Sequence, residues 1–420
     1  MKNTGTIMRL PPIVLLIFFI FFVISFLSNI LGPLIPDIIQ SFDLSLGLAG
    51  FLPFCFFVAY GVASIPAGVL VEKFGEKTMM VAAFGLAFAG AVTFGLNPVF
   101  GTALLSLFLI GIGMAILQVV INPLLRTAGG DVNFAFFSVM AQLFFGAASF
   151  LSPMLYSYLV RNVHAGEAQN GLIRLFNSLV TPELKWVTLY WVFAVIALLM
   201  AVLIGLVKFP KVELKEDERI DTGQAFRVLL RNKFVWMYFL GVFCYVGTEQ
   251  GVANWVSQFL QVYHGVDAST TGATVVSWFW GLLTIGCVLG LFLLKIWDSR
   301  RVLVVFAMGA ILSLLSGLFG PTQVALWAFP LVGFFASVMW SVIVSLALNS
   351  VSQYHGTFAG ILCTGIVGGA VVPLIVGTLG DWIGLRNGML FLFLTLGYIL
   401  SIGIWARPLV NNATLKKRKE

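Results

Sequence analysis

Long apolar runs separated by short polar stretches fill the chain from end to end. Each run reaches about 20 residues, the length that an α-helix needs to cross a hydrocarbon core about 30 Å thick. No stretch between the runs is long enough to fold as a separate soluble domain. The pattern predicts an all-α membrane protein with twelve transmembrane helices, at residues 12–36, 47–71, 78–97, 100–123, 134–160, 187–208, 233–262, 271–295, 301–319, 322–347, 357–379 and 388–408.

The longest interruption of the apolar pattern lies near the middle of the chain, between Lys208 and Lys233. It carries a dense cluster of charges and divides the predicted helices into two groups of six. Two such bundles joined by a linker form the architecture in which one bundle rocks against the other around a site near the bilayer midplane. We therefore expect an N-terminal bundle at 1–208, a cytoplasmic linker at 209–232, a C-terminal bundle at 233–410 and a cytoplasmic tail at 411–420.

Charged residues are scarce: 60% of the 420 residues are hydrophobic and 10% are charged, whereas an ordinary soluble domain is about a quarter charged. When the termini and the loops from even to odd helices are assigned to one side, that side holds 20 of the 24 basic residues, all except Arg161, Arg174, Lys185 and Arg386. The positive-inside rule then places both termini in the cytoplasm. We expect a multi-pass protein embedded in the lipid bilayer of a bacterial inner membrane, with no nucleic-acid partner.

A glycine-rich loop motif lies between the second and third predicted helices, Gly68-x-x-x-Glu72-Lys73-x-Gly75-x-Lys77. Glycines permit close approach of helices, and an acid beside a helix end can hold a neighbouring helix through its dipole. The pattern returns near helices 11 and 12 as Gly377-x-x-x-Asp381-x-x-Gly384-x-Arg386. A basic turn with unrelated glycines is the alternative interpretation. The motif resembles the loop signature of the major facilitator superfamily, which implies the major facilitator fold and a role for these residues in conformational change.

Few strongly polar side chains fall inside the predicted helices, where an unsatisfied polar group is costly. Amides in helices 1, 4, 5 and 7 are candidate substrate ligands, because an amide offers donors and an acceptor that match vicinal sugar hydroxyls. Two tryptophans are candidates for covering the apolar face of a pyranose ring. The alternatives are hydrogen bonds between helices for the amides, and packing or interface anchoring for the tryptophans. The candidates are Asn29, Gln118, Asn122, Gln142, Asn254, Trp280 and Trp340.

Glu249 is the only acidic residue well inside a predicted helix. A carboxylate in hydrocarbon costs about 3 kcal/mol unless it is protonated, paired or hydrated. Glu249 is therefore a candidate for substrate binding and for ion coupling, by carrying a proton or by coordinating sodium together with carbonyl oxygens. The alternative is an acid that hydrogen-bonds between helices for structural reasons.

Stretches along nearly the whole chain resemble the fucose/galactose/glucose permease family of sugar symporters. They include Gln118 with Asn122-Pro123, and the runs Tyr245-Val246-Gly247-Thr248-Glu249 and Val367-Gly368-Gly369-Ala370. Gln118 and Glu249 look like the glucose/galactose branch, because the fucose branch carries an acid at the position of Gln118. The family also carries an acid in helix 1, where the matching run here has Asn29. Asn29 cannot titrate, so the resemblance leaves Glu249 for coupling.

These features predict a secondary transporter that takes up a neutral hexose, of the glucose, galactose, mannose or fucose type, by alternating access coupled to H+ or Na+. An uncoupled sugar uniporter, a carrier of an N-acetylated amino sugar and a membrane sugar receptor are the alternatives. The histidines lie far apart in sequence without a nucleophile or metal ligands beside them, so we expect no enzyme, no cofactor and no metal site. A monomer is expected.

Overall fold

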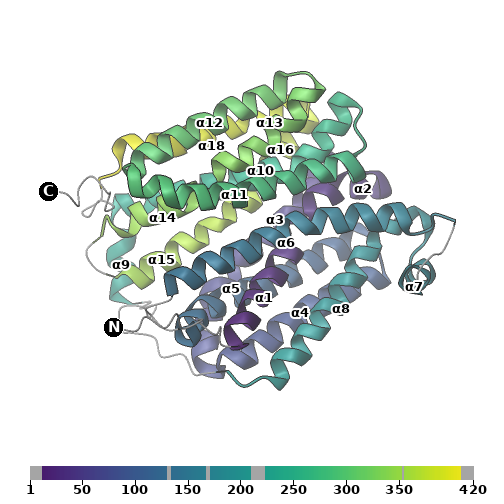
Figure 1. Ribbon diagram of the computed structural model, residues 1–420, viewed down its shortest axis with the longest axis horizontal. Helices are drawn as coiled ribbons and strands as arrows, with labels where there is room; N and C mark the ends of the chain where they lie inside the picture. The colour runs from purple at the N-terminus through teal and green to yellow at the C-terminus, as the bar shows by residue number, and fades with distance from the viewer. Residues whose placement is uncertain (1–11, 130–133, 167–170, 210–222, 352–353, 408–420) are drawn as a thin grey trace, which may run out of the picture.

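The chain forms two bundles of helices, which lie one above the other in Figure 1. The computed structural model describes residues 12–129, 134–166, 171–209, 223–351 and 354–407, and all regular structure in these ranges is helical. The N-terminal bundle, coloured purple to teal, contains α1 (Pro12–Ser28), α2 (Leu31–Phe42), α3 (Leu46–Phe74), α4 (Glu76–Leu96), α5 (Phe100–Gly129), α6 (Phe134–Asn162), α7 (Gly171–Leu179), η1 (Pro182–Val187) and α8 (Thr188–Leu206).

The C-terminal bundle, coloured green to yellow, follows a short helix α9 (Gln224–Leu230) in the predicted linker. The rest of that linker with its charge cluster, at 210–222, and the predicted tail at 411–420 lie outside the described residues. The C-terminal helices are α10 (Lys233–His264), η3 (Ala268–Gly272), α11 (Ala273–Ile296), α12 (Ser299–Phe319), α13 (Thr322–Ala336), α14 (Met339–Leu348), α15 (His355–Thr364), η4 (Gly365–Val367), α16 (Gly368–Ile383), α17 (Leu385–Met389) and α18 (Phe391–Trp405).

Each predicted transmembrane helix has a counterpart in the structure. Within the described residues, 11 segments are long and apolar enough to cross a membrane. The twelfth predicted helix is α10, which has 32 residues but carries a row of amides and Glu249, and it falls outside that set. The all-α fold with twelve transmembrane helices is confirmed, and its least apolar helix is the one on which the sequence places most candidate ligands.

The first predicted helix is interrupted at Asn29 and Ile30, where α1 ends and α2 begins. Pro33 follows four residues after Asn29 and has no N–H, so the Asn29 carbonyl cannot make its regular helical hydrogen bond. The prediction of one helix over 12–36 is therefore wrong in two respects: the helix is broken, and its second part continues to Phe42. A similar interruption separates α13 from α14 at Ser337 and Val338.

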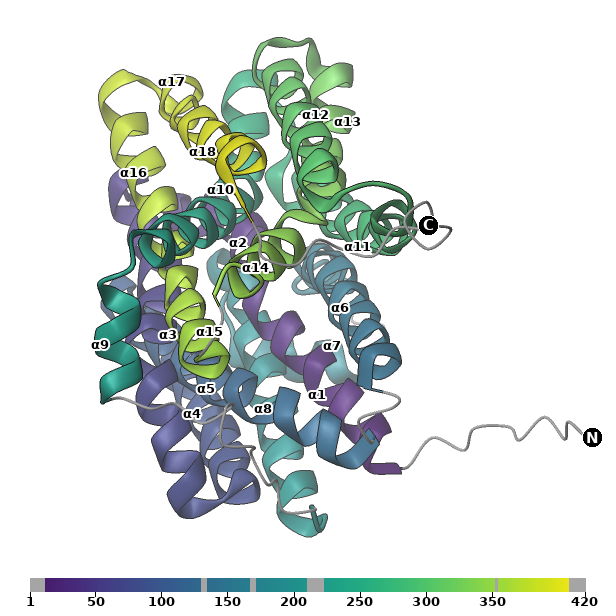
Figure 2. The same cartoon turned by 90° about the vertical axis from the view of Figure 1, so that its left-hand side faces the viewer.

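The most extensive contacts between the two bundles are those of α3 with α16, α6 with α11, and α2 with α10; α6 and α11 lie side by side in Figure 2. We call the side of the molecule with the end of α2, the start of α3, the end of α10, η3 and the end of α16 the α2–η3 face. The side with the start of α1, α9 and the end of α18 is the terminal face. At Gly32 the bundles approach so closely that a Cβ would overlap the carbonyl oxygen of Ala253.

Candidate substrate pathway

A chain of polar side chains follows one side of α10 in the C-terminal bundle. The Tyr245 hydroxyl donates a hydrogen bond to the Glu249 carboxylate. Gln250 Nε2 donates to Glu249 Oε1 over 3.2 Å, and Asn254 Nδ2 donates to Gln250 Oε1 over 3.4 Å. The ring of Trp340 lies 6.0 Å from the ring of Tyr245. Three predicted site residues, Glu249, Asn254 and Trp340, thus belong to one cluster.

A second polar cluster lies between α1 and α6 in the N-terminal bundle, at the interruption of the first transmembrane helix. Asn29 Nδ2 donates to Ser149 Oγ over 2.9 Å, and Ser25 Oγ lies 2.5 Å from Ser149 Oγ. Among the described residues the amide oxygen of Asn29 has no hydrogen-bond partner, so the side chain keeps a free acceptor.

Close contact between α2 and α10 places the two clusters at the same depth. Gly32 packs against Ala253 and Asn254, and both transmembrane segments start on the terminal face. Asn29 and Glu249 each lie about one helical turn before this contact. The amide cluster of one bundle and the carboxylate cluster of the other therefore lie on opposite sides of the bundle boundary, near the middle of their transmembrane segments.

The tryptophans of the second bundle differ in their surroundings. Trp280 is 3% exposed, and its Nε1–H is buried without a hydrogen-bond partner among the described residues. Gln258 Oε1 is buried and unpartnered in the same way. Such groups call for a ligand or a water. Trp255 of α10 is fully buried and donates to Pro373 O over 2.9 Å, so it holds α10 to α16.

The remaining predicted ligands lie on α5 and α6. Gln118 is half-buried, and no described residue hydrogen-bonds to its side chain. Gln142 is exposed and lies about two turns before Ser149 on the same side of α6. Asn122 belongs to α5, but its side chain lies outside the described residues. Among the described side chains, no hydrogen bond joins Gln118 or Gln142 to either cluster.

The sequence interpretation missed a second acid within a transmembrane segment. Asp37 lies in α2, inside the apolar span Pro12–Phe42, and accepts a hydrogen bond from the hydroxyl of Tyr156 in α6. The statement that Glu249 is the only such acid is therefore wrong. The error follows from ending the first helix at Pro36, which the structure places inside α2.

The two copies of the loop motif adopt the same backbone conformation. Gly75 ends α3 with φ 80° and ψ 158°, and Gly384 ends α16 with φ 85° and ψ 147°. This φ range strains any residue that has a Cβ, which explains glycine at both positions. In the first copy of the motif, Gly68 is half-buried. Lys73 in α3 is exposed, and Lys77 in α4 is half-buried. The side chain of Glu72 lies outside the described residues.

The acid of the second copy crosses the bundle boundary. Asp381 Oδ1 accepts from Leu46 N over 2.8 Å and Asp381 Oδ2 accepts from Gly47 N over 2.7 Å. Leu46 and Gly47 form the first turn of α3, whose N–H groups have no partner within the helix. A side chain of the C-terminal bundle therefore caps a helix of the N-terminal bundle, on the α2–η3 face.

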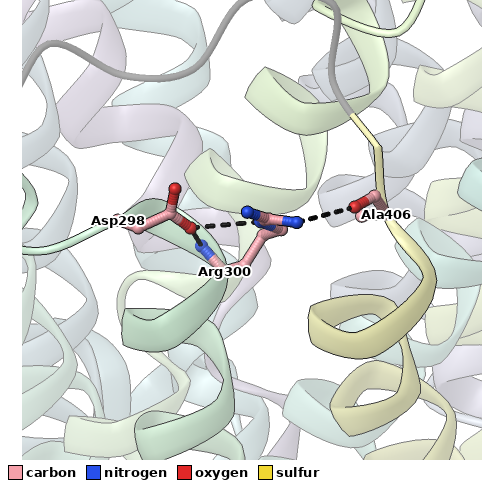
Figure 3. A network of polar contacts seen from close by, with 3 residues as sticks. All are labelled: Asp298, Arg300 and Ala406. Carbon is pink, nitrogen blue, oxygen red and sulfur yellow. Dashed lines mark hydrogen bonds and ion pairs between the residues drawn. The ribbon is translucent and has the colours of Figure 1, made fainter.

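A polar contact at the start of α12 stays within the C-terminal bundle (Figure 3). Asp298 accepts from Arg300 N over 2.9 Å and forms an ion pair with Arg300 Nε at 3.2 Å. Arg300 Nη1 also donates to Ala406 O over 3.4 Å, which ties the start of α12 to the end of α18. Asp298 thus caps α12 within its own bundle.

Twelve transmembrane helices in two bundles, with a polar cluster in each bundle near their boundary, define a polytopic membrane transporter. The family profile of the Major Facilitator Superfamily matches residues 17–366. The chain belongs to this superfamily of transporters and, within it, to the fucose/galactose/glucose permease family. The expectation that it is not an enzyme is confirmed by this membership.

Several characterised proteins are similar over most of their length. The chain is 30% identical to a glucose/galactose transporter of Brucella abortus, over 92% of each chain. It is 26% identical to the L-fucose-proton symporter of Escherichia coli, over 87% of this chain and 86% of that one. The crystal structure of FucP in the outward conformation has a TM-score of 0.67 at 24% identity, covering 94% of this chain and 98% of that chain. An inward-facing bacterial homologue of the lysosomal transporter Spinster has a TM-score of 0.78 at 16% identity, covering 95% and 98%.

Proposed function

We propose that this protein carries a neutral hexose across a bacterial inner membrane by alternating access. The observation that carries the proposal is the pair of polar clusters around Asn29 and around Glu249, one in each bundle, each about one helical turn from the contact of Gly32 with Ala253. The similar glucose/galactose transporter and L-fucose-proton symporter support a sugar as the substrate.

The chemistry of the clusters suits a polyol. Within the described part of the chain, the Asn29 carbonyl and the Gln118 amide have no hydrogen-bond partner, and Trp280 has a buried, unpartnered donor. Each sugar hydroxyl both donates and accepts, so mixed donors and acceptors match it. Trp340, packed against Tyr245, is assigned to the apolar face of the sugar. We also assign Asn122, Gln142 and Asn254 to the sugar pathway.

Alternating access requires the bundles to separate on one side while they close on the other. The closed side here is the α2–η3 face, where Gly32 contacts Ala253 and Asp381 caps α3. The distribution of basic residues assigns the terminal face to the cytoplasm, so the α2–η3 face would be the outer side and this conformation would face inward. The motif residues from Gly68 to Lys77 are assigned to the corresponding closure on the cytoplasmic side.

Glu249 is the residue we assign to coupling with H+ or Na+. Its two oxygens are held by Tyr245 and Gln250, so the carboxylate is fixed at the wall of the pathway. A cation that binds there neutralises a charge that is costly in the membrane. An uncoupled sugar uniporter remains the rival function, because Asn29 and Gln118 are amides that cannot titrate.

The test is uptake of labelled hexoses into proteoliposomes under an imposed pH gradient, an imposed sodium gradient and neither. Wild type is compared with Glu249→Gln and with Glu183→Gln, which makes the same chemical change at an exposed position in η1. We expect one gradient to drive accumulation in wild type and Glu183→Gln. Glu249→Gln should lose accumulation and keep exchange of labelled for unlabelled sugar.

Other outcomes favour the rival functions. Equal, gradient-independent equilibration in all three proteins would contradict coupling and indicate a uniporter. Exchange of N-acetylglucosamine without exchange of hexoses would indicate an amino-sugar carrier. Binding of sugar without any exchange in wild type would indicate a receptor and would overturn the proposal.

A further inference from the structure

Asp37 is an acid at the bundle boundary that the proposed sugar pathway does not use. It lies in α2, one turn after Pro33, and its side chain is half-buried. Tyr156 of α6 is 0% exposed and donates its hydroxyl to the Asp37 carboxylate. A carboxylate within an apolar span is costly in free energy, and acidic residues in such spans are rare and usually functional. The hydrogen bond from a buried tyrosine therefore makes Asp37 a candidate functional residue.

The charges that act on Asp37 come from both bundles. The helices packed against α2 are α3, α10, α11, η1 and η3. Lys185 of η1 attracts the Asp37 carboxylate, and Asp267, the N-cap of η3, repels it. No other charged side chain among the described residues acts on it as a main contributor. Lys185 belongs to the same bundle as Asp37, whereas Asp267 belongs to the other.

Asp267 itself is held in its charged form. Desolvation acts to raise its pKa, but hydrogen bonds from Thr270 and Ser269 and the charge of Arg161 together keep the pKa of Asp267 below its usual value. Thr270 N donates to Asp267 Oδ1 over 2.8 Å and Ser269 Oγ over 3.1 Å. At neutral pH, Asp267 therefore presents a negative charge to whatever approaches η3.

Closure of the α2–η3 face brings these two acids together, because one is carried by each bundle. Two like charges that approach each other oppose closure unless one is neutralised, and the presence of a like charge favours the protonated carboxyl group. Asp267 is stabilised as an anion, so Asp37 is the partner that takes the proton. Separation of the bundles removes the repulsion and favours release of that proton.

We propose that Asp37 binds a proton as the α2–η3 face closes and releases it as the face opens, separately from any ion bound at Glu249. The inference rests on the proposed alternating-access function. Its consequence is that acidity on the side of the α2–η3 face favours the closed, inward-facing conformation. Because one proton is involved, the ratio of closed to open molecules changes by at most about tenfold per pH unit.

The test measures the distance between the bundles by spin labels at Tyr158→Cys in α6 and Val324→Cys in α13, two exposed positions in different bundles. The native cysteines are first replaced by alanine. We expect the closed fraction of wild type to rise as the pH falls from mildly alkaline to mildly acidic. Asp37→Asn should be closed at every pH. A wild type whose distances do not depend on pH would overturn the inference.

Matched variants separate a proton site from a structural role. Asp43→Asn makes the same change at the end of the same helix, at an exposed residue with φ 50° that asparagine adopts readily, and should keep the wild-type pH profile. Asp267→Asn keeps a capping oxygen and removes the charge, so the midpoint should move to lower pH. Tyr156→Phe removes the hydroxyl that donates to the Asp37 carboxylate, so the pH midpoint of closure should move to higher pH. This variant tests the proposal even if Asp37→Asn does not fold.

Sugar exchange on the same proteins distinguishes the two proposals. Asp37→Asn that exchanges sugar and keeps the wild-type pH profile would refute the role of Asp37 and leave the proposed function intact. A wild type that shows the pH-dependent distance change but exchanges no sugar would refute the proposed function and leave the proton site standing.

Discussion

Asp381 accepts two hydrogen bonds from the first turn of α3 across the bundle boundary, and removing them should open the α2–η3 face. The carboxylate accepts from Leu46 N and Gly47 N, over 2.8 and 2.7 Å. Both bonds cross the bundle boundary, so they exist only while the face is closed. Asp381→Ala therefore destabilises the closed conformation and leaves the open one unchanged.

The size of the effect follows from the kind of contact. Loss of a side chain that caps a helix N-terminus costs about 1 kcal/mol, and Asp381 is exposed, so the cost is not raised by burial. About 1 kcal/mol corresponds to an approximately fivefold fall in the ratio of closed to open molecules. Asp381→Asn keeps one acceptor and loses the attraction of a charge to the helix dipole, about 0.5 kcal/mol or about twofold.

Spin-label distances between positions 158 and 324 measure this ratio directly. The matched control is Ser45→Ala, because Ser45 Oγ caps the same helix by accepting from Leu48 N over 3.2 Å, within a single bundle. We expect the open fraction to be largest in Asp381→Ala, smaller in Asp381→Asn and smallest in wild type. Ser45→Ala should have the same open fraction as wild type. If Ser45→Ala opened the face as much as Asp381→Ala, the effect would come from fraying of α3 and the reasoning would be refuted.

Three further predictions use single contacts. Gly32→Ala should slow transport about tenfold or more, because the added Cβ would overlap Ala253 O and overpacking of this kind costs about 1–3 kcal/mol. The control Gly85→Ala has open space around the added Cβ and should not change the uptake rate. Trp280→Phe should raise the sugar concentration for half-maximal exchange about fivefold through loss of a donor worth about 1 kcal/mol, and Trp278→Phe at an exposed position should leave it unchanged. Because the pKa of Asp267 is lowered in the folded protein, its carboxylate stabilises the fold above the usual pKa of 3.8, and this contribution is lost as pH falls through the lowered value. Wild type should therefore melt at a higher temperature than Asp267→Ala at neutral pH, and the difference should disappear in strong acid. A difference that persists in strong acid would contradict this prediction.

The transmembrane helices could be predicted from the sequence because the membrane allows few backbone conformations. Apolar length alone defines a span when every backbone group must be satisfied within its own helix. The helix over 233–262 is found by the same reasoning although it is polar, since its flanking charges and its length match those of its neighbours. The interruption at Asn29 was not foreseen, because Pro33 can kink a helix or be tolerated within it, and the outcome depends on the packing of α2 against α10.

The site was predicted less completely, and the missing parts are contacts between distant segments. Glu249, Asn254 and Trp340 were foreseen and lie together because they share α10 and its neighbours. The partner of Asp381 was not foreseen, because 335 residues separate it from Leu46 and nothing in the local pattern of α3 indicates a second cap. Asp37 was missed for a simpler reason: the predicted helix ended at Pro36, directly before it, whereas α2 continues to Phe42.

The positions of the three acids suggest how closure and binding depend on each other. Glu249 lies at mid-depth on the wall of the pathway, whereas Asp37 and Asp381 lie where the bundles meet at the α2–η3 face. Asp381 stabilises closure by accepting hydrogen bonds from Leu46 N and Gly47 N, and under the proposal above Asp37 stabilises it when it carries a proton, so falling pH strengthens the closed face. Glu249 lies on α10 between Tyr245 and Ala253, and Ala253 contacts Gly32 of α2. A ligand that orders this part of α10 therefore also orders the surface against which α2 packs when the face closes. Substrate binding and closure would then be coupled through one rigid element, which is the requirement for alternating access.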